Sequence, residues 1–153
     1  PPPPPPPPPP SHHTDFYFNY GLSYDLRDSA YRPTSGHRTN FYQTLPMVSD
    51  NNEISNTFSA SKYKTLNETS GMVGKASFYV QSVHSLTDDD VRISKRAKIP
   101  YNRLRGFERN KVGPLDDGDF VGGNYVSTLN LSTNLIFVKQ IMFSLLSTNP
   151  HNL

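Results

Sequence analysis

Apolar and polar residues alternate without interruption from residue 16 to residue 26. The apolar or aromatic positions are Phe16, Phe18, Tyr20, Leu22, Tyr24 and Leu26. The residues between them are Tyr17, Asn19, Gly21, Ser23 and Asp25. A period of two predicts a β-strand with one apolar face and one mostly polar face. Strands of soluble sheets usually have about 5 or 6 residues, so a strand this long is typical of a barrel that spans a membrane.

Further segments also have the alternation or composition of extended chain. They are His37–Leu45, which we expect Pro46 to end, Ile54–Leu66, Met72–Val83 and Phe120–Leu135. In the last segment, we expect Val121 and Gly123 to share one apolar face with Tyr125. Turn-forming residues fill the intervals 28–36, 49–53 and 67–71, and the apolar run 137–146 fits either strand or helix. The pattern therefore predicts an all-β chain of successive antiparallel hairpins.

Composition narrows the class of protein. Only 34% of the residues are hydrophobic, and no stretch has the roughly 20 apolar residues of a membrane-spanning helix. A barrel remains possible, because its strands need apolar side chains only at every second position. The chain has no cysteine, so disulfides and cysteine-based metal sites are excluded. Residues 1–15, which open with a run of prolines, are interpreted as a disordered tail or an artefact and are left out of the fold.

Basic residues gather in one segment of the chain. Against a single acid, Glu108, they are Arg92, Lys95, Arg96, Lys98, Arg103, Arg105, Arg109 and Lys111. The segment belongs to a connection, residues 86–119, that is long enough to indicate a function. A nucleic-acid patch would explain the charge, whereas a basic loop in the aqueous lumen of a barrel, or against anionic lipid, also fits the alternating strands. We see no nucleophile–base pair and no metal-ligand set, and we expect neither enzyme activity nor a cofactor.

Glycine, proline and charged residues mark the ends of the predicted strands. A turn pattern follows the first strand and contains Asp25, Arg27, Asp28, Pro33 and Gly36. The long connection contains Arg105, Gly106, Phe107, Gly113 and Pro114, and the pair Gly122 and Gly123 opens the last strand. Gly106 allows a sharp turn, and Phe107 can anchor the loop by burying its ring. Arg105 offers a planar fork of donors for a carboxylate.

These elements, in this order and spacing, resemble the BamA-type family of outer-membrane barrel-assembly insertases over about residues 16–137. The resemblance implies a transmembrane antiparallel β-barrel of about sixteen strands, of which this chain holds about five or six. It places the Arg105–Phe107 triplet and the Gly113–Pro114 pair on a loop that folds back and plugs the lumen. Arg105 would there face acidic residues of later strands. Residues 138–153 do not match the family pattern and are expected to form an unrelated tail.

The resemblance also implies a function. The parent protein would be an insertase that folds β-barrel proteins into the bacterial outer membrane, or into the outer membrane of mitochondria or chloroplasts. Its partners would be unfolded outer-membrane β-barrel clients, accessory lipoproteins of an assembly complex and membrane lipid, with no nucleic acid. A two-partner secretion translocator of the same superfamily shares the loop motif, and a soluble basic nucleic-acid-binding protein is the alternative from another class. With two open sheet edges, the isolated chain is expected not to fold stably.

Overall fold

The computed structural model describes residues 15–48, 52–104, 106–108, 111–134 and 143–147. The elements in these ranges are β1 (Phe16–Asp25), β2 (Gly36–Val48), β3 (Glu53–Asn67), β4 (Met72–Ser85), the 3-10 helix η1 (Tyr101–Arg103), β5 (Leu115–Asp116), β6 (Asp119–Phe120), β7 (Tyr125–Asn134) and β8 (Phe143–Ser147). The long strands β1, β2, β3, β4 and β7 have 10, 13, 15, 14 and 10 residues. No helix in these ranges is long and apolar enough to cross a membrane.

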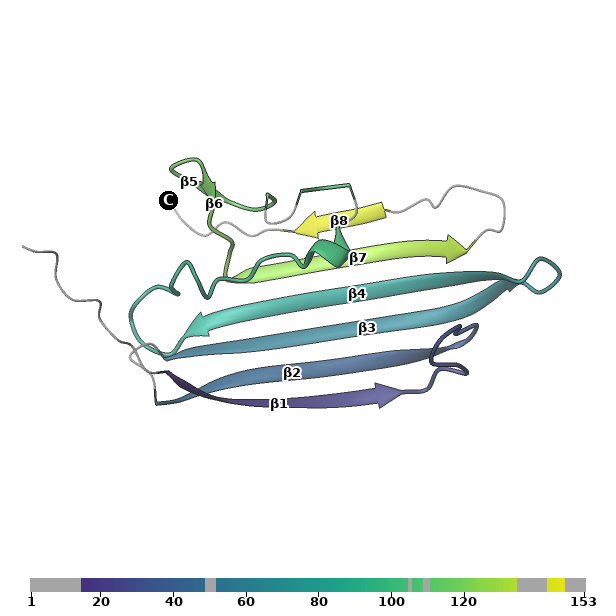
Figure 1. The fold of residues 1–153 in the computed structure, drawn as a ribbon, viewed down its shortest axis with the longest axis horizontal. Coiled ribbons are helices and arrows are strands. Elements are labelled where there is room, and N and C mark those ends of the chain that lie inside the picture. The colour runs from purple at the N-terminus through teal and green to yellow at the C-terminus, as the bar shows by residue number, and fades with distance from the viewer. Residues whose placement is uncertain (1–14, 49–51, 105, 109–110, 135–142, 148–153) are drawn as a thin grey trace, which may run out of the picture.

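Six strands form one sheet in the order β1-β2-β3-β4-β7-β8 (Figure 1). Each strand pairs antiparallel with the next, so the expected all-β antiparallel fold is confirmed. The short strands β5 and β6 pair only with each other, within the connection between β4 and β7. Strand β8 falls in the segment 138–153, which we expected to be an unrelated tail. It pairs with β7, and the paired positions run from Leu131 opposite Phe143 to Ser127 opposite Ser147.

Strand β2 is longer than the sequence pattern predicts. It continues through Pro46 to Val48, so the expectation that Pro46 ends the strand is wrong. Pairing between β2 and β3 stops at Thr44 and Ser55, so no β3 carbonyl requires an amide donor from Pro46. Pairing with β1 continues past Pro46 after a register shift between Phe16 and Tyr17. A proline at a bulge, outside the doubly paired part of a strand, removes no ladder hydrogen bond.

Strand β7 starts later than the sequence pattern predicts. It begins at Tyr125, so Val121 and Gly123 do not share its apolar face. Val121 is buried within the connection, and Gly123 forms an isolated bridge with Ala97. Gly122, with φ +77°, interrupts the extended chain between these two residues. The alternation from residue 120 onward therefore belongs partly to the connection and partly to the strand.

The sheet register separates side chains onto two faces of different character. One face, here called the apolar face, carries the aligned row Leu22, Phe41, Phe58 and Val80 and the row Ala60, Phe78 and Leu129. The other, the polar face, carries the row Ser23, Asn40, Ser59, Tyr79 and Thr128. Hydrogen bonds join neighbours on the polar face, since the Ser23 hydroxyl donates to Asn40 Oδ1 at 2.8 Å and Asn40 Nδ2 donates to Ser59 Oγ at 3.3 Å.

One row on the apolar face is polar. It contains Tyr20, Gln43 and Asn56, which lie side by side on β1, β2 and β3. The Tyr20 hydroxyl donates to Gln43 Oε1 at 2.6 Å, and Gln43 Nε2 donates to Asn56 Oδ1. Because these side chains satisfy one another, the row can lie on an otherwise apolar surface without leaving all of its polar groups unpaired.

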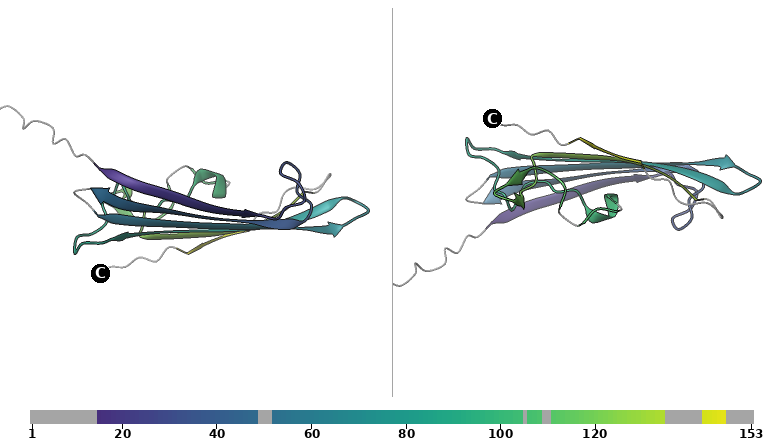
Figure 2. Two further views of the ribbon diagram at one scale, coloured as in Figure 1. Left: turned by 90° about the horizontal axis from the view of Figure 1, so that it is seen from below. Right: turned by 90° about the horizontal axis from the view of Figure 1, so that it is seen from above.

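The buried core lies on the polar face, beneath the long connection. Its members are Tyr79, Val83, Val91, Ala97, Ile99, Leu104 and Val126, with Val112 packed against them. The two edge-on views show η1 raised above one side of the sheet (Figure 2). No described segment covers the apolar face, and Phe16, Leu22 and Leu131 on it are 60%, 66% and 46% exposed. An exposed, largely apolar face of this kind indicates contact with a partner or a membrane.

Candidate functional site

The connection between β4 and β7, residues 86–124, is held against the polar face at its base. Leu86 donates its amide to the carbonyl of Asn52 at 2.7 Å, and the Arg92 amide donates to Glu53 Oε1 at 3.1 Å. Glu53 is only 5% exposed, and its Oε2 has no hydrogen-bond partner among the described residues. A buried carboxylate that accepts a backbone amide fixes the direction in which the chain leaves β4.

Apolar packing fixes the middle of the connection. Val91, Ala97, Ile99 and Leu104 come from the connection and pack on Tyr79, Val83 and Val126 of β4 and β7. Leu104, at 5% exposed, is the last of these residues before the Arg-Gly-Phe triplet. Burying a leucine side chain stabilises a fold by about 1.5 to 3 kcal/mol. The connection is therefore a packed layer on the sheet.

Two basic side chains of the connection, Lys95 and Arg103, contact aromatic rings of the sheet. Lys95 Nζ lies 4.5 Å from the ring centroid of Tyr17 in β1, and the Arg103 guanidinium lies 4.9 Å from the ring centroid of Tyr79 in β4. Arg96 Nε donates to the Val91 carbonyl at 3.2 Å within the connection. Contacts of a cation with an aromatic face are worth about 0.5 to 2 kcal/mol each. Lys95 thus links the connection to the first strand, although the connection starts from the fourth.

The Gly122–Gly123 pair joins the connection to itself just before β7. Gly123 and Ala97 exchange two backbone hydrogen bonds, of 2.8 and 3.0 Å. A Cβ on Gly122 would lie 2.7 Å from the Ala97 carbonyl oxygen, so only glycine allows this approach. Pro114 accepts a hydrogen bond from the Val121 amide at 3.1 Å, and Gly113 has φ +140°. The Gly122–Gly123 pair therefore closes the loop that contains the Arg-Gly-Phe triplet and the Gly113–Pro114 pair.

The Arg-Gly-Phe triplet is described only in part. Arg105 lies outside the described residues, and its predicted contact with a carboxylate stays a prediction. Gly106 has φ +90°, the conformation that a sharp turn needs. The expected burial of the Phe107 ring is not seen in this chain, because the ring is 57% exposed. Leu104, 5% exposed, is instead the buried residue next to the triplet.

The turn motif after β1 forms two compact hydrogen-bonded units. Asp25 accepts two hydrogen bonds from the Arg27 guanidinium, at 2.8 and 2.7 Å, and Arg38 Nε lies 3.7 Å away. Asp28 accepts hydrogen bonds from the Thr34 amide at 2.9 Å, from the Ser35 amide at 3.2 Å and from the Thr34 hydroxyl. Both carboxylates are therefore engaged within the motif.

These donors hold the pKa of the Asp28 carboxyl below its ordinary value of 3.8, chiefly through the Thr34 hydroxyl and then the Ser35 amide. The turn's contribution to stability is accordingly present above the unfolded-state pKa and is lost as the pH falls through the folded-state value. Gly36 closes the turn with φ +92°. Pro33 precedes Thr34, whose carbonyl accepts a hydrogen bond from Thr65 Oγ1 at 3.3 Å. The turn is thus linked to β3 as well as to β1 and β2.

Sequence reasoning predicted the long connection, but it placed Gly122 and Gly123 at the start of a strand, and it missed the residues that hold the connection on the sheet. Glu53 was read as part of a polar turn, and neither Lys95 nor Tyr17 carried a signal for the other. Contacts between residues so far apart in the chain depend on the sheet register, which one sequence does not show. The functional roles assigned to the motif residues, and the division at residues 15 and 137, stay predictions.

Comparisons with known proteins give one family and one fold. The model of the Omp85 superfamily domain matches residues 10–146. A solved structure of BamA from Haemophilus ducreyi, lacking POTRA domains 1–3, is similar in fold, with a TM-score of 0.72 at 24% identity. The match covers 83% of this chain and 27% of the BamA chain, so this chain spans about a quarter of that protein's length. No curated protein matches the chain.

Proposed function

Because the chain belongs to the Omp85 superfamily, we propose that it forms part of the barrel of an outer-membrane assembly factor that folds and inserts β-barrel proteins. Proteins of this superfamily lie in outer membranes and act as insertases or translocators without enzymatic chemistry. Bacterial outer membrane is the location that we propose, since the similar structure comes from a bacterium. The chain would supply part of the barrel wall, and its connection between β4 and β7 would support that wall from the inside.

The observation that carries the proposal is the difference between the two sheet faces. Lipid can cover the exposed apolar face, while the polar face, with the connection packed on it, suits an aqueous lumen. Strands of 10 to 15 residues are long enough to span a bilayer when tilted. A β-sheet can span a bilayer only if it closes into a barrel. The rest of the wall would come from the longer protein.

In this function the connection supports the barrel shape. It packs on β4 and β7 and reaches β1 through Lys95. It therefore supports the inner side of the sheet from β1 to β7. Unfolded client strands would pair elsewhere, at the seam of the complete barrel, and accessory lipoproteins would bind outside this chain. The free energy for insertion would come from the client's strand pairing and from the burial of its apolar surface in lipid, with no nucleotide or cofactor.

The basic residues argue against the nucleic-acid-binding alternative. Such a protein would direct its cations outward to phosphates, whereas Lys95 and Arg103 lie over aromatic rings of the sheet. Binding to nucleic acid would also leave the exposed apolar face uncovered. Both features follow from a barrel wall with a lumenal loop.

Reconstitution of the full-length protein in liposomes tests the proposal. We expect an unfolded client barrel, added from outside, to become folded and protease-protected much faster than in empty liposomes. The L104D variant, which places a carboxylate in the core under the connection and costs about 3 kcal/mol or more, should lose this activity. The L115D variant is the matched control, because Leu115 belongs to the same connection but is 61% exposed.

Two results would contradict the proposal. Client insertion no faster than in empty liposomes, combined with transport of a soluble partner through the protein, would identify a secretion translocator. Equal activity of the L104D variant and the wild type would show that the packed connection has no part in the function.

A further inference from the structure

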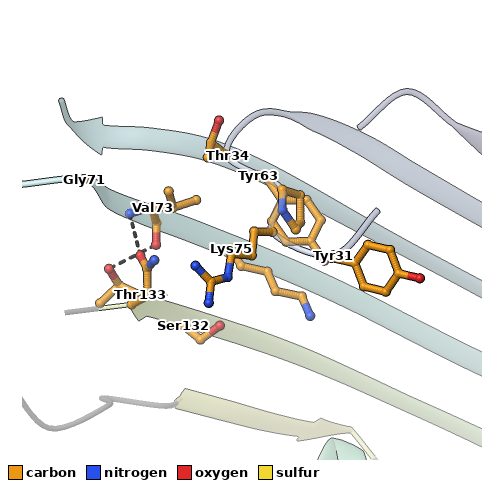
Figure 3. A pocket seen from close by; sticks show the side chains of 11 residues that line it. Tyr31, Thr34, Tyr63, Gly71, Val73, Lys75, Ser132 and Thr133 are labelled. Carbon is orange, nitrogen blue, oxygen red and sulfur yellow. Dashed lines mark hydrogen bonds between the residues drawn. The ribbon is translucent and has the colours of Figure 1, made fainter. Parts of the chain in front are cut away.

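A cavity of about 660 Å³ opens on the polar face, at the end of the sheet where β1 turns into β2 (Figure 3). Its floor is a row of three aligned residues, Tyr63 of β3, Lys75 of β4 and Ser132 of β7. Tyr31 and Arg32, from the turn between β1 and β2, form one wall. Its volume lies in the range that binds small ligands or short peptide segments.

The charge of the cavity is entirely positive. Among the described residues that line it, Arg32 and Lys75 are the two cations, and none is acidic. Lys75 Nζ lies 5.5 Å from the Tyr63 ring centroid, and within the described ranges neither cation forms an ion pair. The acids closest to Arg32 along the chain, Asp28 and Asp25, are already engaged within the turn motif. Two cations next to hydroxyl and aromatic groups are suited to an anionic ligand.

The walls of the cavity are held in place by the chain itself. Asn134 Oδ1 accepts the Val73 amide at 2.6 Å, and Thr133 Oγ1 donates to the Val73 carbonyl at 3.2 Å (Figure 3). The turn wall is fixed by the bonds of Asp28 to Thr34 and by the bond of Thr65 to Thr34. All lining residues belong to β3, β4, β7 and two turns.

We propose that this cavity binds an acidic peptide segment, with its carboxylates on Arg32 and Lys75 and its backbone beside the hydroxyl of Ser132. A lipid headgroup does not fit, because the cavity opens on the face opposite the apolar one. A nucleic acid would need a longer basic track to neutralise successive phosphates, and this site has two cations. The inference goes beyond the proposed function, since neither insertion nor export by itself requires such a site.

The test uses the full-length protein in detergent and a labelled ten-residue peptide of alternating glutamate and serine. We expect this peptide to bind at least about tenfold more tightly than its glutamine counterpart. The R32Q/K75Q variant should lose at least about tenfold in affinity, while R32K/K75R keeps the charge and retains most of it. The K111Q variant is the control, because Lys111 pairs with Glu108 outside the cavity.

Three results would overturn the inference. They are equal binding of the glutamate and glutamine peptides, unchanged affinity in R32Q/K75Q, and complete displacement of the peptide by a single-stranded oligonucleotide at equal charge concentration. Client insertion is measured on the same variants. Since Arg32 and Lys75 lie away from the core under the connection, insertion should be unchanged in R32Q/K75Q, which separates failure of this site from failure of the proposed function.

Discussion

The G36A variant should be less stable than the wild-type protein by about 3 kcal/mol or more. Gly36 has φ +92°, a conformation that alanine adopts only with strain. In addition, a Cβ at this position would lie 2.0 Å from the Leu26 carbonyl oxygen and 2.9 Å from Arg27 Cα. Both are backbone atoms, so relief requires the turn itself to move. That movement would separate β1 from β2 at the turn motif.

Urea unfolding of the full-length protein in lipid vesicles measures this loss. The matched control is G71A, because Gly71 also has a positive φ, +63°, but a Cβ there meets nothing within 4 Å. Only the backbone strain should remain at that site, a cost of about 1 kcal/mol. Equal losses in the two variants would show that the close approach of Gly36 to Leu26 does not exist in the folded protein.

The G122A variant should break the contact between the two ends of the connection, at Ala97 and Gly123, while the sheet stays folded. A Cβ on Gly122 would lie 2.7 Å from the Ala97 carbonyl oxygen, and the residue has φ +77°. Accommodating it breaks the paired bonds between Ala97 and Gly123, at a local cost of about 2 to 3 kcal/mol. Hydrogen exchange at the Ala97 and Gly123 amides should then accelerate by about 30-fold or more.

The control for this variant is G118A, in the hairpin of β5 and β6. Gly118 has φ +86°, and a Cβ there meets nothing within 4 Å, so the Ala97 amide should stay protected. Protease cleavage within residues 86–124 gives an independent measure of the broken contact. If hydrogen exchange at the Ala97 amide were unchanged in G122A, the paired hydrogen bonds between Ala97 and Gly123 would not exist in the folded protein.

The sequence predicted the strands best where one face of the sheet has no protein cover. In β1 every second residue is apolar, because no other described part of the chain shields that face, and the alternation is therefore complete. In β7 the same rule placed Val121 and Gly123 on a strand, although the backbone turns at Gly122. Pro46 led to a strand that was predicted too short. Its missing amide donor would disrupt β2 only where β2 pairs with strands on both sides.

The candidate site was predictable as a set of motifs but not as a set of contacts. Glycine at residues 36 and 106 indicated turns, and both residues have a positive φ. Gly122, which the pattern placed in a strand, also has a positive φ. Burial of Leu104, the hydrogen bond from Arg92 to Glu53 and the reach of Lys95 to Tyr17 depend on how the connection lies on the sheet. Nothing local in the sequence encodes that placement, and the cavity beside Arg32 arises from the register of three strands.

Accessibility along β4 in liposomes tests most directly whether lipid covers the apolar face. The chain has no cysteine, so single cysteines at residues 76, 77, 78, 80 and 81 can each carry a nitroxide label. We expect labels at the even positions to be reached by oxygen dissolved in the bilayer and protected from a water-soluble relaxation agent, and labels at 77 and 81 to show the reverse. Absence of this alternation, or contact of the even positions with water, would contradict a lipid-facing apolar wall.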